Sequence, residues 1–384
     1  MILVVMSLFL IAFFVLFILI WLISRKAIIE FLLEPLIFSS KYIYIYDFIL
    51  LGSTVISVLV RMNLIETNWI VTNSLRTHYL LMGISWLLCL LYAVKIFIKK
   101  FPNKKKDLFI DKRREFLKKN VALGGIGVVV SATTVGAVQA FEPKLEKLDI
   151  KLSEKHKKLS GLKIAQLSDI HIGPTLKKSF FDSLVEQTNE LDADIVVITG
   201  DMVDGTVKGL KDELEGLSKF KSKLGVYYVT GNHEYYWNGV EWINFVKSKN
   251  VKVFENNSIT LRYNEEEFHL GGVYDLKATR FEKTHTCSPH EVFPKDDKYK
   301  ILLAHQPNSC KLTDGLGINL QLSGHTHGGQ GFPWNFIVSL AQPYLKGLYD
   351  YKGMQLYVNR GTGFWGPPYR LGIPGEITLL TLKS

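Results

Sequence analysis

Residues 195–204 have the sequence Ile-Val-Val-Ile-Thr-Gly-Asp-Met-Val-Asp. A run of β-branched apolar residues predicts a short strand that is buried on both faces. The Gly200-Asp201 pair then turns the chain and places a carboxylate directly beyond the strand. Apolar residues recur with helical spacing on either side, over 180–191 and 210–220, so strands and helices alternate. This order predicts an α/β domain with a layered sheet core.

Polar motifs follow the other predicted strands of this region in the same way. These strands cover 162–167, 225–229, 301–304 and 320–322. The motifs that follow them are Asp169-Ile170-His171, Gly231-Asn232-His233-Glu234, the single His305, and Gly324-His325-Thr326-His327-Gly328-Gly329. Ligands of α/β sheets bind beyond the carboxyl ends of the strands, so we expect these residues to meet there.

The residue types in these motifs predict a metal centre. Imidazole and carboxylate together suit Zn, Fe and Mn, and the lack of thiolate in the motifs argues against a structural zinc cage. A single Asp-x-His occurs often by chance, but a series of such pieces, each after a predicted strand, does not. The cysteines form neither a CxxC pair nor a disulfide framework; they are Cys89, Cys287 and Cys310.

The order D-x-H, G-D-x-x-D, G-N-H-E, H and G-H-x-H resembles that of the calcineurin-like metallophosphoesterase superfamily. The resemblance covers roughly residues 150–384. The G-H-T-H-G-G-Q ending and the apolar N-terminal part are most similar to the membrane-associated subgroup that contains the YkuE and YaeI phosphodiesterases. This resemblance implies a β-sandwich flanked by helices, a two-metal site at one edge, and activity as a metal-dependent phosphoric ester hydrolase.

The resemblance also implies a role for each motif residue. A first divalent ion, Mn, Fe or Zn, would be held by Asp169, His171 and His327, a second by Asn232, His305 and His325, and Asp201 would bridge the two. A shared anionic bridge suits paired divalent ions, which activate a water and clamp phosphoryl oxygens. His233 matches the position that faces the substrate, where it would protonate the leaving oxygen.

Three further residues are expected near this centre. Asp204 and Glu234 would orient ligand or catalytic histidines. Arg370, in a Pro-Tyr-Arg segment that also resembles the subgroup, has two interpretations. It would either bind phosphate through a bidentate contact or form a structural ion pair.

The first 150 residues differ in composition from the rest. The 384-residue chain is 47% hydrophobic, with a net charge of +10 and a mean hydropathy of +0.13, which excludes a disordered protein. Residues 1–150 hold 18 Lys+Arg and 10 Asp+Glu, a net of +8, whereas residues 151–384 hold 28 and 26, a net of +2. The positive charge therefore belongs to the apolar part, and it does not indicate nucleic-acid binding.

Four apolar stretches in this part are candidate membrane spans, because about 20 apolar residues cross a bilayer core. They cover about 1–23, 43–60, 79–98 and 121–141. Asp47 weakens the second stretch, and the fourth is only mildly apolar. We therefore expect an all-α, multi-pass transmembrane module over 1–148 and a metallophosphoesterase domain over 149–384.

Basic residues in the connecting loops predict the orientation of this module. The loops after the first and third stretches hold 13 Lys+Arg, and the loop after the second holds 2. The positive-inside rule makes the basic side cytoplasmic, which puts the catalytic domain outside the plasma (inner) membrane. Residues 112–118 resemble a twin-arginine export signal, with an ordinary anchor loop as the alternative, and 138–140 offers a cleavage site.

The expected function is hydrolysis of a phosphodiester or monoester by a metal-activated water, next to membrane lipids. One alternative is a lipid-linked substrate, as for hydrolases that cleave the pyrophosphate of UDP-2,3-diacylglucosamine in lipid A synthesis. That nucleotide lipid is cytoplasmic, on the other side from the predicted topology. A non-catalytic scaffold is a further alternative, but such proteins usually lose metal ligands, and here every ligand position has the expected residue type.

Overall fold

The computed structural model describes residues 18–30, 43–61, isolated positions between 81 and 96, 111–332 and 334–384. The chain divides into two compact units, Met1–Val135 and Gly136–Ser384. The second unit starts before the expected position 149, because it includes the end of helix α4 (Asp111–Phe141). Ala140 near this end is fully buried in the core of the second unit.

Helix α2 (Ile43–Arg61) and most of α4 lie in the first unit. The predicted span 43–60 falls in α2 and the span 121–141 falls in α4. Most of the spans 1–23 and 79–98 lies outside the described residues. In the part of the chain that the structure describes, no helix has both the length and the apolar character needed to cross a membrane.

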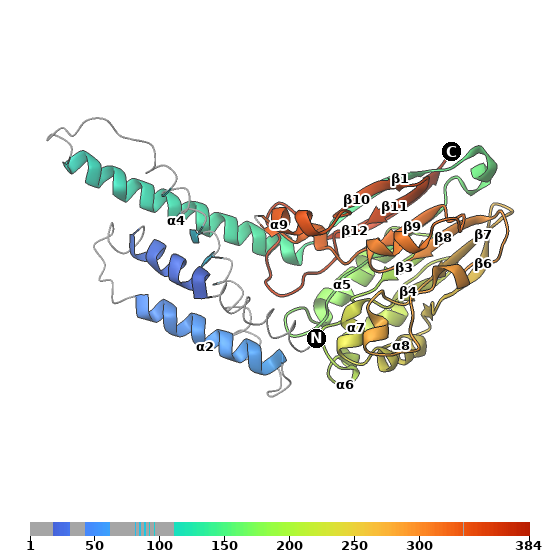
Figure 1. Ribbon diagram of the computed structural model, residues 1–384, viewed down its shortest axis with the longest axis horizontal. Helices are drawn as coiled ribbons and strands as arrows, with labels where there is room; N and C mark the ends of the chain where they lie inside the picture. The colour runs from blue at the N-terminus through green and yellow to red at the C-terminus, as the bar shows by residue number, and fades with distance from the viewer. Residues whose placement is uncertain are drawn as a thin grey trace. The chain divides into compact units, whose positions relative to one another are not determined.

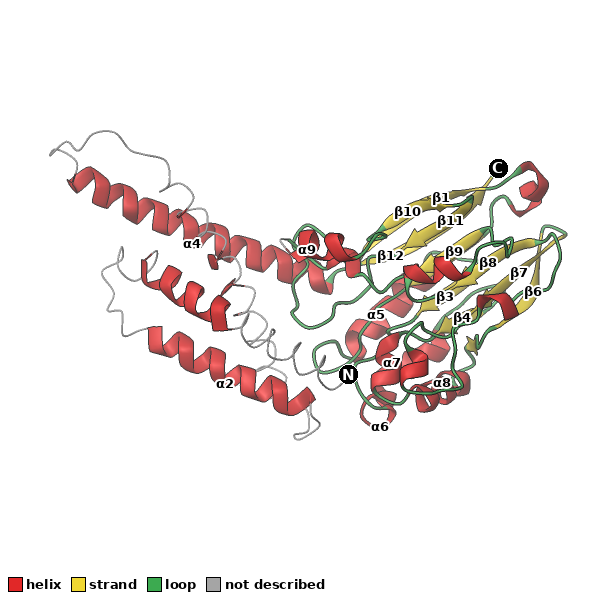
Figure 2. Ribbon diagram, in the orientation of Figure 1, coloured by secondary structure: helices red, strands yellow, loops and turns green. Residues whose placement is uncertain are grey.

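The second unit is built on two six-stranded sheets, each with parallel and antiparallel pairs (Figure 2). One sheet has the order β1 (Lys144–Lys151), β12 (Glu376–Lys383), β2 (Lys163–Leu167), β3 (Ile195–Thr199), β4 (Val226–Val229) and β5 (Lys252–Val253). The other has the order β10 (Gly347–Tyr351), β11 (Met354–Val358), β9 (Leu320–Ser323), β8 (Tyr299–Leu303), β7 (Glu266–Gly272) and β6 (Asn257–Tyr263).

Alternating side chains of β3 show how the layers pack. Ile195 and Val197 lie in a core cluster that contains residues of both sheets. Val196 and Ile198 point to the other face and pack in a second cluster with residues of helices α5 (Lys178–Asn189) and α8 (Gly239–Ser248). Both helices and β3 are labelled in Figure 1. Because both faces of β3 are covered, every residue of this strand is buried, as its β-branched sequence predicts.

The predicted α/β domain with layered sheets is confirmed, but the element boundaries differ in places. The helix predicted over 210–220 is divided into α6 (Val207–Leu210) and a 3₁₀ segment (Lys211–Lys219) with non-helical backbone at Leu214. Strands β1, β6, β10, β11 and β12 were not predicted. β1 and β12 extend the first sheet by pairing in parallel, far apart in sequence, and local pattern carries no signal for such a pairing.

Candidate metal centre

The predicted ligands come together because five strands end at the same place. β2, β3 and β4 are parallel neighbours in one sheet, and β8 and β9 are parallel neighbours in the other. The residues that follow their carboxyl ends form three overlapping groups of carboxylates and imidazoles, with the ligand atoms of each group within 4.8 Å of one another. These groups are Asp169–His171–His327, His171–Asp201–His233 and Asp201–His305–His325.

The first group is held by short contacts between ring nitrogens and a carboxylate. Nε2 of His327 lies 3.0 Å from Nε2 of His171 and 3.3 Å from Oδ1 of Asp169. The backbone N–H of His325 donates to both carboxylate oxygens of Asp169, at 3.1 and 2.9 Å. All three side chains are buried, so the group offers two imidazole nitrogens and a carboxylate to one point inside the protein.

The second group is centred on Asp201. Its Oδ2 lies 3.0 Å from Nε2 of His305, and its Oδ1 accepts a hydrogen bond of 2.7 Å from the backbone N–H of His233. Nδ1 of His325 lies 3.2 Å from Nε2 of His305. Asp201 also belongs to the group that includes His171, so its carboxylate lies between the two sides of the site.

Asn232 completes the set of predicted ligands with an unpaired oxygen. Its amide nitrogen donates to the hydroxyl of Tyr236 at 3.1 Å, and its Oδ1 is buried with no hydrogen-bond partner. A buried polar atom without a partner costs about 1–3 kcal/mol. Since Nδ2 is engaged, Oδ1 is the atom that remains for a cation, and the residues present fit a divalent metal ion.

The backbone is strained at most of these ligands. Five of the seven have left-handed backbone, with φ of +51° at Asp169, +55° at His171, +50° at Asp201, +72° at His325 and +52° at His327. Left-handed non-glycine residues cost of order 1–3 kcal/mol when the conformation is sparsely populated, and they cluster at functional sites. The fold therefore holds these side chains in positions that local backbone preference opposes.

Glycine is required at two positions beside the candidate ligands, because side-chain atoms of the site lie very close to the backbone there. A Cβ at Gly324 would lie 1.9 Å from Oγ of Ser168 and 2.2 Å from Oδ2 of Asp169. A Cβ at Gly231 would lie 2.2 Å from Oδ1 of Asp201. Any larger residue at these two positions would displace a ligand carboxylate.

The electrostatics favour the metal-binding form at three of the candidate ligands, Asp201, His325 and His327. Burial favours a neutral Asp201, but His305 and His233 outweigh it and hold the pKa of Asp201 well below its usual range. Burial lowers the pKa of His325 and His327 well below the usual range, and the neighbouring His305 and His171 add to this effect. Metal binding needs ionised carboxylate and neutral imidazole, which are the forms favoured at these three residues. Burial instead raises the pKa of Asp169. Burial lowers the pKa of His305, but Asp201 and Asp169 outweigh it and raise that pKa to about 10.

His233 lies beside the ligands and is held by Asp204. Nδ1 of His233 bonds Oδ1 of Asp204, whose Oδ2 lies 3.1 Å from Nδ1 of His171. Burial disfavours a charged His233 ring, but Asp201 and Asp204 outweigh this effect and raise its pKa to about 9. Asp204 therefore contacts both His171 and His233, the kind of residue it is expected to orient.

Glu234 and Arg370 have partners that differ from those expected. The Glu234 carboxylate accepts from the backbone N–H groups of Gly231, Asp201 and Met202, at 2.7, 3.0 and 2.7 Å, so it fixes two loops rather than a histidine. Arg370 is fully buried, and its guanidinium bonds backbone carbonyls and a ring nitrogen of His327. Neither of its two expected roles, a phosphate contact or an ion pair, corresponds to these contacts.

Two residues of the site were missed in the sequence. The Ser168 hydroxyl donates to Oδ2 of Asp169 at 2.6 Å, and the Tyr236 hydroxyl accepts from Asn232. Tyr236 lies four residues after Asn232 in the short helix α7 (Asn232–Tyr236), a spacing that puts both on one helix face. That spacing was the available signal, but α7 itself was not predicted.

Aromatic side chains surround His233. The ring of Tyr236 is centred 4.9 Å from the His233 ring, Trp365 lies 5.9 Å away, and Phe281 packs against Tyr236 at 5.5 Å. Tyr236, Phe281 and Trp365 are 48%, 53% and 47% exposed. We call these three residues the aromatic rim. It gives the surface next to His233 an apolar character.

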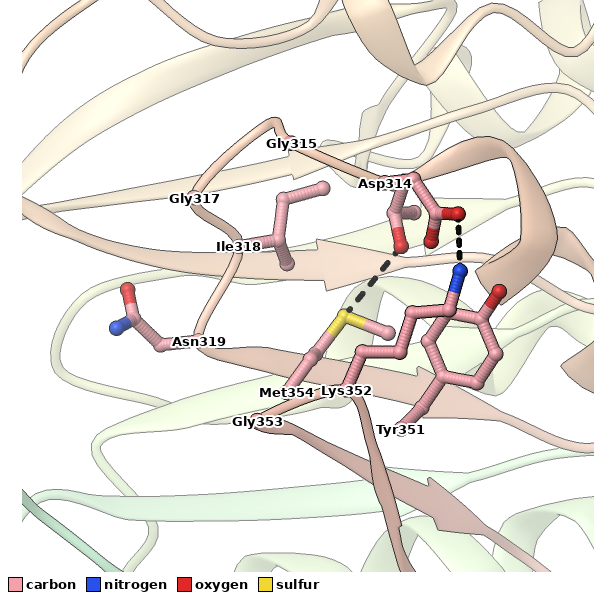
Figure 3. Close-up of a pocket in the computed structure, with 10 residues that line it drawn as sticks. Asp314, Gly315, Gly317, Ile318, Asn319, Tyr351, Lys352, Gly353 and Met354 are labelled. Carbon is pink, nitrogen blue, oxygen red and sulfur yellow. Dashed lines mark hydrogen bonds and ion pairs between the residues drawn. The ribbon is translucent and has the colours of Figure 1, made fainter.

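A hollow at the amino ends of β9 and β11 lies away from this cluster of ligands. Figure 3 shows its lining, which includes Asp314, Ile318, Lys352 and Met354. Lys352 and Asp314 form an ion pair between half-exposed side chains. Its lining contains no histidine, so none of the metal-binding groups described above draws on it.

Carboxylates and imidazoles gathered at the carboxyl ends of strands in a layered α/β core are typical of metal-dependent hydrolases. Residues 162–329 match the family model for the calcineurin-like phosphoesterases. The chain is 34% identical to an uncharacterized metallophosphoesterase of Helicobacter pylori, over 89% of this chain and 90% of that protein. It belongs to the calcineurin-like metallophosphoesterase family and is a metal-dependent phosphoester hydrolase, as the motifs predicted.

Two other relatives agree with the predicted subgroup. The chain is 29% identical to the uncharacterized metallophosphoesterase YkuE of Bacillus subtilis, over 71% of this chain and 98% of that protein. It is 36% identical to a protein of Bos taurus named as a transmembrane protein with a metallophosphoesterase domain, over 67% of this chain and 61% of that protein.

Proposed function

We propose that the second unit hydrolyses phosphoesters at a centre of two divalent metal ions, Mn, Fe or Zn. The observation that carries this proposal is the unpaired, buried Oδ1 of Asn232 beside two groups of ligand atoms that share the Asp201 carboxylate. Asp169, His171 and His327 would hold one ion, and Asn232, His305 and His325 the other. A neutral Asn in place of a further carboxylate limits the negative charge around a site that must accept a phosphate anion.

The roles of the protein groups follow from their contacts. Bound divalent ions would supply an activated water and neutralise charge on the phosphoryl oxygens. His233 is only partly buried and is not needed to complete either set of ligands, so it is free to hydrogen-bond the leaving oxygen and transfer a proton to it. Asp204 holds the His233 ring through Nδ1, which leaves Nε2 for the substrate.

The aromatic rim supports a substrate with an apolar group near the leaving oxygen. Tyr236 and Trp365 both contact His233, so a group attached to the oxygen that His233 protonates would lie against exposed rings. Contact with apolar area contributes roughly 25 cal/mol per Å². A lipid-linked phosphoester is therefore the second candidate substrate class, beside small phosphodiesters.

A membrane position for the enzyme is supported by sequence and by relatives. The apolar stretches of residues 1–141 and the basic loops between them suit a multi-pass module with the catalytic domain outside the cytoplasm. Relatives from Bos taurus and Danio rerio are named as transmembrane proteins. A reporter fused after Ser384 tests on which side of the membrane the catalytic domain lies. We expect activity of a periplasm-dependent reporter, and activity of a cytoplasm-dependent reporter would contradict the predicted orientation.

A panel of esters tests the function itself. Full-length protein, purified and loaded with Mn, Fe or Zn in turn, should hydrolyse bis-p-nitrophenyl phosphate. Octylphosphonate should then inhibit this hydrolysis more strongly than methylphosphonate, and Trp365→Ala together with Phe281→Ala should reduce the difference. No hydrolysis with any metal would contradict the proposed function, whereas equal inhibition by the two phosphonates would contradict only the apolar substrate class.

A further inference from the structure

Gln330 is the last residue of the G-H-T-H-G-G-Q segment, and the proposed chemistry gives it no role. It lies three residues after His327, and its backbone N–H donates to the carbonyl of His327 at 2.8 Å. The backbone of Gln330 is left-handed, with φ of +58°. Such a conformation is uncommon for a residue other than glycine, and it persists where the surrounding contacts fix the residue.

The Gln330 side chain bonds the backbone of the segment 365–368 at three atoms. Its Oε1 accepts from the N–H of Trp365 at 3.0 Å, and its Nε2 donates to the carbonyls of Trp365 and Pro367 at 2.7 and 3.3 Å. The opposite orientation of the amide would set its NH₂ group against an N–H and its oxygen against two carbonyls. Both polar ends of one side chain therefore hold the same segment.

The segment 365–368, Trp-Gly-Pro-Pro, depends on such contacts from outside. Pro367 and Pro368 have no backbone N–H to donate, and Gly366, with φ of +71°, adds backbone freedom. The residues on either side are held in the protein interior, since Phe364 and Arg370 are 3% and 0% exposed. Gln330 therefore fixes the more accessible middle of a segment that is anchored on both sides.

Trp365 is the residue of this segment that lies beside His233. Its ring is centred 5.9 Å from the His233 ring, with an angle of 78° between the ring planes. Gln330 bonds both the N–H and the carbonyl of Trp365, so it restricts the backbone from which the indole ring extends. The place of the ring in the aromatic rim is thus set by a residue that does not touch His233 itself.

We propose that Gln330 is a positioning residue for Trp365, and that the two together favour substrates with an apolar group on the leaving oxygen. The proposal rests on the proposed function, because it takes His233 as the residue that faces this oxygen. A fixed indole ring offers the apolar group a ready contact surface. A ring that is not fixed must be ordered when the substrate binds, and that ordering weakens binding.

The Gln330→Glu variant tests this role in the full-length, metal-loaded protein. Glutamate has the same shape and still accepts from the N–H of Trp365, but its second oxygen would face two carbonyls and repel them. We expect octylphosphonate to lose roughly tenfold of its advantage over methylphosphonate as an inhibitor of bis-p-nitrophenyl phosphate hydrolysis. A tenfold loss corresponds to about 55 Å² of apolar contact, roughly a quarter to a third of the area that an aromatic side chain buries.

Two comparisons separate positioning from a general effect of charge. The added charge should weaken both phosphonates alike, so the ratio of their inhibition constants reports the apolar contact. Gln187→Glu makes the same change at an exposed residue of α5 and should leave this ratio unchanged. In a Trp365→Ala background, Gln330→Glu should have little further effect on the ratio, because the ring that Gln330 positions is gone.

The outcomes distinguish this inference from the proposed function. A wild-type ratio in Gln330→Glu would overturn the positioning role, and so would an equal loss of the ratio with and without the Trp365 ring. If Gln330→Glu does not fold, Gln330→Met has a similar length without the amide, and a wild-type ratio in that variant would overturn the role.

The wild type itself provides the remaining tests. Equal inhibition of the wild type by the two phosphonates would overturn this inference together with the apolar substrate class, and would leave phosphoester hydrolysis in place. No hydrolysis by the wild type with any metal would overturn the proposed function, and this inference with it.

Discussion

The two ends of the second sheet place titratable residues in different ways. At the carboxyl ends of β8 and β9, the candidate ligands His305 and His327 are buried and His325 is partly buried, and two of these three have left-handed backbone. At the amino ends of β9 and β11, the charges are the half-exposed pair Asp314 and Lys352, in turns where left-handed residues are expected. A hollow alone therefore does not mark a site; clustered titratable side chains held in strained backbone do.

Loss of the shared carboxylate should have the largest effect at the carboxyl end. In Asp201→Asn, no anion remains between the two groups of ligands, and neighbouring dications then repel each other strongly in a buried site. We expect hydrolysis of bis-p-nitrophenyl phosphate at background level and one of two bound ions lost. Elemental analysis and turnover of the same sample check this, and full retention of both ions would contradict the bridging role.

Removal of the His233 side chain should leave the metals and damage the chemistry. His233→Ala takes away a positioned proton donor, which is usually worth roughly 10²–10⁴-fold in rate. We expect a decrease of that size, smaller for p-nitrophenyl esters than for alkyl esters, because a good leaving group needs little protonation. An equal decrease for both kinds of ester, or the loss of a metal ion, would show that His233 has another role.

Asp204→Asn should have a smaller effect, because Asp204 acts through His171 and His233. An amide keeps the shape but can no longer accept equally from both rings as an anion. We expect a loss of about 10–100-fold in kcat/KM or in affinity for one ion, the usual range for groups that orient metal ligands. Steady-state kinetics and a metal titration distinguish the loss of kcat/KM from the loss of metal affinity. Wild-type values of kcat/KM and of metal affinity would contradict this role of Asp204.

Asp314→Asn, the matched change at the amino end, should have the smallest effect. The ion pair with Lys352 joins half-exposed side chains, and many such surface pairs contribute nothing measurable to stability. We expect unchanged turnover, unchanged metal content and an unfolding temperature within experimental error of the wild type. A loss of activity comparable to that of Asp204→Asn would mean that the hollow in Figure 3 contributes to function.

The sequence predicted which residues come together at the candidate site because each of them lies shortly after a strand. A buried run such as Ile195–Thr199 is recognisable locally, and the carboxyl ends of parallel strands must meet. The partners of Arg370 could not be predicted, since they depend on how a segment 43 residues beyond His327 folds back. β1, and the packing of the α4 end within the second unit, were missed for the same reason: pairing with β12 and the contact with Gly372 are set by tertiary structure, not by local pattern.

The metal stoichiometry of active, full-length protein tests the central claim most directly. Protein freed of metal by a chelator and reloaded with Mn, Fe or Zn should hold two ions per chain. Hydrolysis of bis-p-nitrophenyl phosphate should be absent without metal and return as the ions bind. Full hydrolysis with no bound metal would contradict a two-metal centre built around Asp201. A single bound ion that remains in the Asp201→Asn variant, with full activity, would also contradict it.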